Sequence, residues 1–83
     1  MTVILGIKTD NRLESAICIQ RVLTEFGCFV RTRLGLHEIS ENYCSKYGLI
    51  ILEILNDEKA ILIENKLLDI EGIETQRMIF SFE

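Results

Sequence analysis

The chain has 83 residues, of which 48% are hydrophobic, and a net charge of −4 from nine basic and 13 acidic side chains. That length fits one domain, residues 1–83, and the basic residues form no dense cluster of the kind that grips phosphates, so we expect no direct nucleic-acid binding. No apolar run approaches the ~18 residues of a membrane-spanning helix, and the N-terminus lacks the features of a signal peptide. These properties predict a cytoplasmic protein with no membrane partner.

The first third of the chain predicts a strand followed by a helix. Residues 2–8 are a short apolar and β-branched run, which is typical of a buried strand. Thr9, Asp10 and Asn11 come next, and their side-chain oxygens suit the start of a helix. Apolar residues then recur at helical spacing over 12–26, and Gly27 stands where helices often end in a residue with positive φ.

The middle of the chain predicts two strands joined by a long loop. Residues 28–36 alternate, which places Arg31, Arg33 and Gly35 on one face and the intervening residues, Val30, Thr32, Leu34 and Leu36, on the other. Residues 37–47 are mostly polar and predict a loop. Residues 48–55 form the most apolar run and predict a central strand that is covered on both faces.

The last third predicts a second helix and a final strand. Asn56 precedes two acidic residues, a pattern that favours the start of a helix. Residues 59–68 continue as that helix, with Ala60, Ile63 and Leu67 on its inner face. After a turn over 69–72, residues 73–83 alternate as a strand.

The predicted order is β-α-β-β-α-β. It indicates an α+β, ferredoxin-like fold, in which a four-stranded antiparallel sheet carries two helices on one face. The other face of the sheet is then bare. Because the chain is short and apolar, a second copy is the simplest cover, and we expect a homodimer or homotetramer.

Several segments resemble a known family. Residues 33–36 (Arg-Leu-Gly-Leu), the polar loop and residues 48–54 are similar to the central hairpin of the iron-only hydrogenase system regulators, which are small ACT-like proteins. Residues 66–67 (Lys-Leu) and 70–73 (Ile-Glu-Gly-Ile) resemble a step in that family's second helix and last strand. The resemblance covers most of the chain and implies an ACT-like fold, related to the ligand-sensing domain of nickel-responsive regulators, that associates through its sheet. The chain departs from the family at Glu74 and Gln76, where lysines are usual, and at Leu68, where a small or polar residue is common.

The first candidate ligand site is the segment Thr9, Asp10, Asn11 and Arg12. The N–H groups at a helix start can hold a carboxylate or phosphate, and the ACT-like resemblance implies a small effector between such a loop and a neighbouring subunit. Helix capping with a solvated arginine is the simpler interpretation of the same residues.

The second candidate group is Arg33 with Arg31, Gly35 and His37. Two arginines on one strand face can bind an anion through paired hydrogen bonds, although a solvent-facing surface or salt bridges to Glu53 or Glu74 explain them more simply. Arg33 is the stronger candidate because it belongs to the family-like segment.

Metal binding and catalysis have less support. His37 with Cys28 or Cys44 offers too few ligands at no recognisable spacing, unless a symmetric oligomer doubles them. We therefore expect no metal, no cofactor and reduced cysteines. The sequence shows no nucleophile–base pair and no glycine-rich phosphate loop, which predicts a protein that is not an enzyme.

Two functions agree with these patterns. The first is a small regulatory or sensor module that oligomerises through its sheet, binds a small effector and has a link to iron-only hydrogenase regulation. The alternative is a structural domain that docks a protein partner and has no small-molecule ligand.

Overall fold

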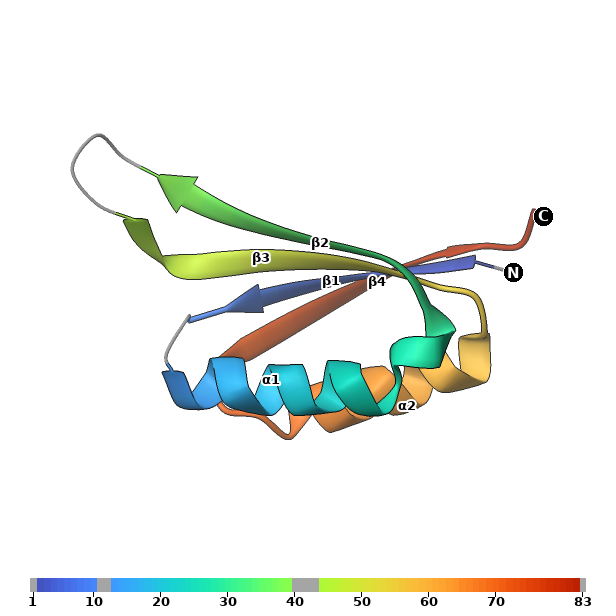
Figure 1. Ribbon diagram of the computed structural model, residues 1–83. Helices are drawn as coiled ribbons and strands as arrows, with labels where there is room; N and C mark the ends of the chain where they lie inside the picture. Colours follow the sequence, from blue (N-terminus) through green and yellow to red (C-terminus); the bar gives the residue numbers. More distant parts are fainter. Residues whose placement is uncertain (1, 11–12, 40–43, 83) are drawn as a thin grey trace.

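The computed structural model describes residues 2–10, 13–39 and 44–82, and gives the backbone alone for 36–39 and 44–47. The elements along these residues are β1 (Thr2–Thr9), α1 (Leu13–Glu25), the 3-10 helix η1 (Gly27–Phe29), β2 (Val30–Ile39), β3 (Cys44–Ile54), α2 (Asp57–Leu68) and β4 (Ile73–Phe80). The strands form one antiparallel sheet in the order β2-β3-β1-β4, and both helices lie on the same face of it (Figure 1). The predicted ferredoxin-like fold is confirmed.

The core lies between the sheet and the two helices. Val3, Leu5 and Ile7 alternate along β1 and point toward the helices, and each is at most 2% exposed. Both helices bury apolar stripes at the helical spacing that the sequence predicts, and Ala16, which has the same spacing in α1, is half-buried. The buried apolar residues of the helices are Ile19, Val22 and Leu23 from α1, and Ala60, Ile63 and Leu67 from α2. Burial of each large side chain contributes about 1.5–3 kcal/mol, so this layer supplies most of the driving force for folding.

The start of α2 is capped as predicted. The Asn56 side chain accepts a hydrogen bond from the backbone N–H of Lys59 at 2.9 Å. Asp57 and Glu58 occupy the first turn, where negative charge is favourable against the helix dipole. The far end of α2 is tied to α1 by an exposed ion pair of 3.1 Å between Lys66 and Glu25.

A partly buried acidic residue joins α2 to the edge strand β4. Glu64, whose side chain is 13% exposed, accepts a hydrogen bond of 2.7 Å from the Thr75 hydroxyl. Its second carboxylate oxygen lies 2.8 Å from Nε of Arg77. Both carboxylate oxygens therefore have partners, as a carboxylate removed from water requires.

Two sequence predictions about turns and loops are wrong. Residues 37–47 are not one long loop, because β2 continues to Ile39 and β3 already begins at Cys44, with these two residues paired. Backbone hydrogen bonds between strands do not depend on side-chain polarity, so a polar segment can extend a hairpin. Gly27 lies in η1, and the glycine with positive φ in the described residues is Gly72, at 86°.

A β-bulge at Arg31 changes which residues of β2 share a face. Val30 pairs with the buried Ile54, whereas Thr32 pairs with Glu53, so the register shifts by one residue between them. Val30 therefore packs against the core, and Thr32 and Leu34 face away from the helices. The prediction that Val30 and Thr32 share a face is wrong, because the extra residue of a bulge reverses the alternation.

Candidate functional site

The end of β1 is held against the turn that precedes β4. The backbone N–H of Asp10 donates to the carbonyl of Gly72 at 3.0 Å, and the Asp10 carboxylate lies directly over the Gly72 Cα. A few residues further on, the buried Ser15 hydroxyl donates to the carbonyl of Glu71 at 3.1 Å. These bonds fix the position of the β1–α1 connection relative to β4.

A hollow of about 390 Å³ lies beside this junction. Its lining consists of Lys8, Thr9, Asp10, Gly72, Ile73 and Glu74. The volume is within the range of small-molecule sites, and the lining offers an ammonium, two carboxylates and the main chain around Gly72. Only Gly fits at position 72, because φ is positive there and a Cβ would collide with the Asp10 carboxylate.

The structure separates the candidate residues into two groups. Thr9 and Asp10 lie at this hollow, whereas Arg33 and Gly35 lie on β2, at the opposite edge of the sheet. The backbone of His37 is in the same cross-strand row as Thr9, because both residues pair with Gly48. Asn11 and Arg12, like the side chain of His37, lie outside the described part of the chain.

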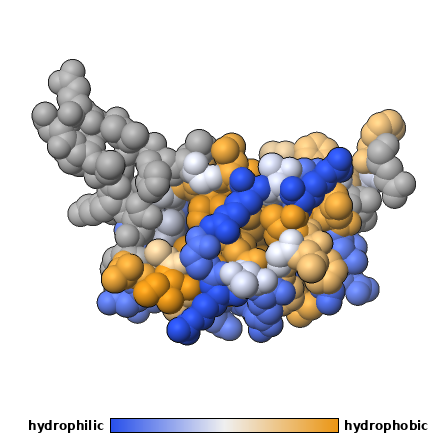
Figure 2. All heavy atoms as spheres, in the orientation of Figure 1, coloured by the Kyte–Doolittle hydropathy of each residue, from blue (hydrophilic) through white to orange (hydrophobic). Residues whose placement is uncertain are grey.

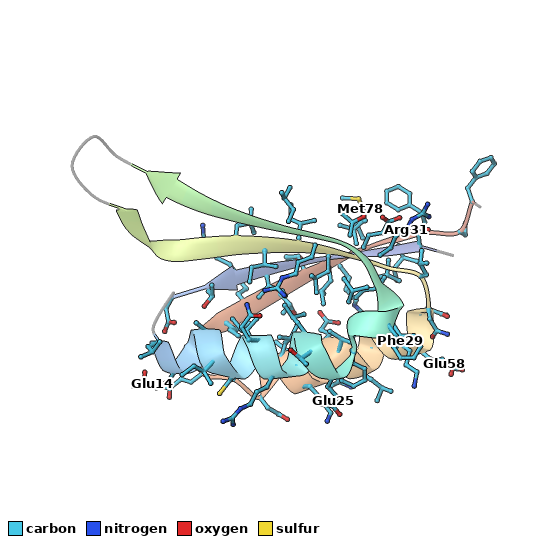
Figure 3. The ribbon with its side chains drawn as sticks, in the orientation of Figure 1. Glu14, Glu25, Phe29, Arg31, Glu58 and Met78 are labelled. Atoms are coloured by element: carbon cyan, nitrogen blue, oxygen red, sulfur yellow. The ribbon has the colours of Figure 1, made fainter. Side chains whose placement is uncertain are left out.

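The two arginines of β2 do not form the predicted pair on one strand face. Arg33 pairs with Leu52, which faces the helices, and the bulge falls at Arg31. Figure 3 draws Arg31 on the side of the sheet away from the helices, the same side as Met78. The carboxylate of Glu53 accepts a hydrogen bond of 2.8 Å from Thr32, and no ion pair to Arg31 or Arg33 is present among the described side chains.

The described residues contain no group of three potential metal-ligating side chains. Cys18 is a free, half-buried thiol on α1, and Cys28 is a free, exposed thiol in η1. The predicted combination of His37 with Cys28 or Cys44 stays a prediction, because the side chains of His37 and Cys44 lie outside the described set.

The face of the sheet away from the helices is apolar along a diagonal, which we call the outer stripe. The register of the four strands places its members on neighbouring strands from the β2 edge to the β4 edge. The members are Leu34, Leu49, Ile51, Ile4, Met78 and Phe80. Leu34, Met78 and Phe80 are 49%, 57% and 47% exposed. Figure 2 shows hydrophobic side chains along this upper side of the molecule, interrupted by a few hydrophilic ones.

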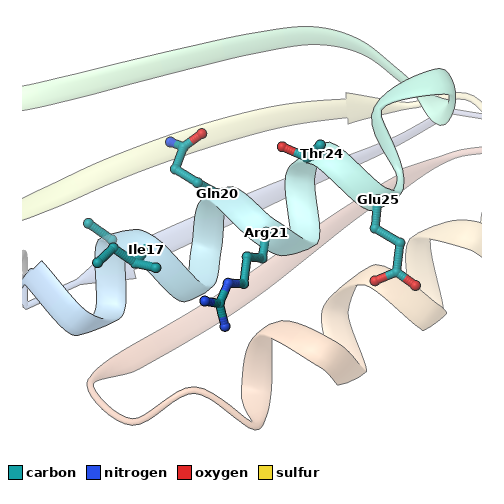
Figure 4. A pocket seen from close by; sticks show the side chains of 6 residues that line it. Ile17, Gln20, Arg21, Thr24 and Glu25 are labelled. Atoms are coloured by element: carbon teal, nitrogen blue, oxygen red, sulfur yellow. The ribbon is translucent and has the colours of Figure 1, made fainter.

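A second apolar surface runs along α1. It is a shallow hollow of about 590 Å³ lined by Ala16, Ile17, Gln20, Arg21, Thr24 and Glu25. Figure 4 shows Gln20 and Thr24 projecting toward the sheet, and Arg21 and Glu25 projecting toward the side of α2. Apolar periodicity does not predict this surface, because four of its six lining residues are polar.

Comparison with solved structures shows the class of fold. An uncharacterized protein of Thermotoga maritima superposes with a TM-score of 0.79 at 19% identity, over 93% of this chain and 92% of that one. The ACT domain of a GTP pyrophosphokinase from Chlorobium tepidum superposes with a TM-score of 0.62 at 15% identity, over 94% and 97%. The divalent ion tolerance protein CutA1 of Ehrlichia chaffeensis superposes with a TM-score of 0.58 at 18% identity, over 99% of this chain and 83% of that one. At these identities the likeness establishes an ACT-like, ferredoxin-like fold.

No protein-family model matches the sequence, and no curated protein is significantly similar to it. Among the described residues, no helix has the length and apolar character needed to cross a membrane.

Proposed function

We propose that this chain is a non-catalytic regulatory module that pairs with a second copy through the outer stripe and binds a small effector in the hollow beside Asp10 and Gly72. The observation that carries the proposal is the exposed outer stripe. Both helices cover the other face of the sheet, and within the described part of the chain no helix covers this one, where Leu34, Met78 and Phe80 are about half exposed. A symmetric pair buries the same patch on both copies.

The effector part of the proposal is supported by the hollow at the end of β1. It lies where Asp10 and Gly72 hold two connections together, so a bound molecule contacts both at once. The resemblance of residues 33–36 and 48–54 to the hydrogenase system regulators adds a proposed link to iron-only hydrogenase regulation.

The association is tested by light scattering on two variants that carry the same substitution. Leu34→Lys places a charge in the outer stripe, and Leu68→Lys places one at an equally exposed leucine on α2, 52% against 49%. We expect the wild type and Leu68→Lys to be oligomeric and Leu34→Lys to be monomeric. A monomeric wild type at high concentration would overturn the proposal.

The effector is tested by thermal unfolding in the presence of single amino acids, nucleotides and divalent metal ions. A compound that binds only the native state and is present at a concentration of 100 times its Kd raises the free energy of unfolding by about 2.7 kcal/mol, which is readily measured. The expected result is at least one stabilising compound, and failure of the whole panel would remove the effector from the proposal.

A second candidate function is a protein-docking domain without a small-molecule ligand. The hollow along α1 favours it, because Leu13 and Ile17 are 74% and 47% exposed at one end of that surface. Reproducible recovery of a hydrogenase-maturation protein by the wild type, lost in Ile17→Lys and retained in Leu68→Lys, would favour this function.

A further inference from the structure

The outer stripe has two different flanks. On one side a hollow of about 360 Å³ lies over Gly6 and is lined by Gly6, Lys8, Leu49, Glu74 and Gln76. On the other side Thr32 and Glu53 stand next to each other, joined by their hydrogen bond. One flank is therefore recessed and carries the Lys8 ammonium group with the Glu74 carboxylate across from it, and the opposite flank carries the Glu53 carboxylate.

The charged groups of the two flanks are too far apart to pair within one chain. Lys8 lies opposite Leu49, and Glu53 is four residues further along β3, which corresponds to about 13 Å along the strand. Within the described part of the chain, neither Lys8 nor Glu53 takes part in an ion pair. Both charges are available to another molecule.

A two-fold axis that runs along the outer stripe exchanges the two flanks. The apolar stripe of one copy then covers that of the other, and Glu53 of each copy faces the Gly6 hollow and Lys8 of the other copy. Because the stripe crosses the strands diagonally, the strands of the two sheets cross at roughly 90°, one of the two common classes of sheet packing.

A two-fold axis perpendicular to the stripe fits less well. It also covers the stripe, but it places hollow against hollow and leaves empty space between the sheets. Interfaces, like protein interiors, are densely packed, and voids forfeit van der Waals contact.

We propose that two copies of this chain pack their sheets face to face with the two-fold axis along the outer stripe, so that Glu53 of each copy enters the Gly6 hollow beside Lys8 of the other. This arrangement rests on the proposed association through the outer face. The two contacts between Glu53 of one copy and Lys8 of the other then determine how the two sheets are oriented.

The test uses two charge-reversed variants, Lys8→Glu and Glu53→Lys, alone and mixed. Each variant alone brings like charges together at both junctions, and we expect its self-association to weaken at least about tenfold. In the mixture every junction again joins a carboxylate and an ammonium, so mixed dimers should form with nearly wild-type affinity. Arg21→Glu, an equal charge change on exposed α1, should associate like the wild type.

A second variant tests the hollow without changing charge. A Cβ at Gly6 meets nothing closer than the Gln76 carbonyl oxygen at 3.8 Å, so Gly6→Val fits the isolated chain. We expect it to fold normally by circular dichroism and to associate at least about tenfold more weakly, because the side chain fills the space that receives Glu53.

The outcomes separate this arrangement from the association itself. If the wild type is monomeric, the proposed function fails. If the wild type associates and neither charge reversal weakens the association, or if mixing Lys8→Glu with Glu53→Lys does not restore it, only the two-fold arrangement proposed here is overturned.

Discussion

Gly72 is the residue whose backbone the fold constrains most clearly. Its φ of 86° is unfavourable for any side chain, and Asp10 occupies the space that a Cβ needs. We expect Gly72→Ala to lower the free energy of unfolding by about 1–3 kcal/mol, measured by urea denaturation. Gly35→Ala is the control, because a Cβ there has no neighbour within 4 Å, and its effect should stay within about 0.5 kcal/mol. Equal effects of the two substitutions would contradict this role of Gly72.

Glu64 and Glu25 form ion pairs that differ in burial, and we expect the more buried pair to contribute more to the free energy of unfolding. Glu64 is largely buried and binds both Thr75 and Arg77, so Glu64→Gln should cost about 1–3 kcal/mol of stability. Glu25 pairs with Lys66 where both side chains are about half exposed, and Glu25→Gln should cost less than about 1 kcal/mol. Urea denaturation of both variants measures the difference, and a larger loss at Glu25 would reverse the argument.

At the level of elements, Asn56 determines where α2 begins. Asn56→Ala removes the acceptor for the Lys59 N–H and should lower stability by about 1 kcal/mol, measured by thermal or urea unfolding. Asn56→Asp keeps an acceptor at that position and should be close to wild type. If both variants lose the same stability, the cap is not the cause.

Elements whose apolar residues repeat at a clear period can be predicted from the sequence. The prediction is wrong where a local main-chain feature interrupts that period. The stripes of both helices and the cap at Asn56 follow from apolar spacing and side-chain chemistry, and they are confirmed. The bulge at Arg31 has no side-chain signature, so the alternating pattern wrongly predicts that Val30 and Thr32 share a face of β2. The hollow at Asp10 cannot be predicted from the sequence, because Gly72, which also lines it, comes from a turn more than 60 residues later, and single-sequence patterns do not report such pairings.

At the scale of the whole molecule, association predicts a stability that depends on concentration. A higher protein concentration favours the folded oligomer over unfolded single chains by mass action. The Tm of the wild type should therefore rise measurably when the protein concentration is increased a hundredfold. The Tm of Leu34→Lys should not change over the same range. A Tm of the wild type that is independent of concentration would show that the folded chain gains no stability from a partner.

The β1–β4 pairing brings the two ends of the described fold together. Thr2 pairs with Phe80, so the first and last strands bring both ends of the described part of the chain to the same side of the molecule (Figure 1). A short glycine-rich connection could join them, and new ends could be opened after α1 without breaking any strand pair. Such a circular permutant keeps all the contacts of the core but brings β4 and β1 close together in sequence. It would therefore separate the stability of the fold, which should be nearly unchanged, from its folding rate, which should rise as that long loop closure is removed.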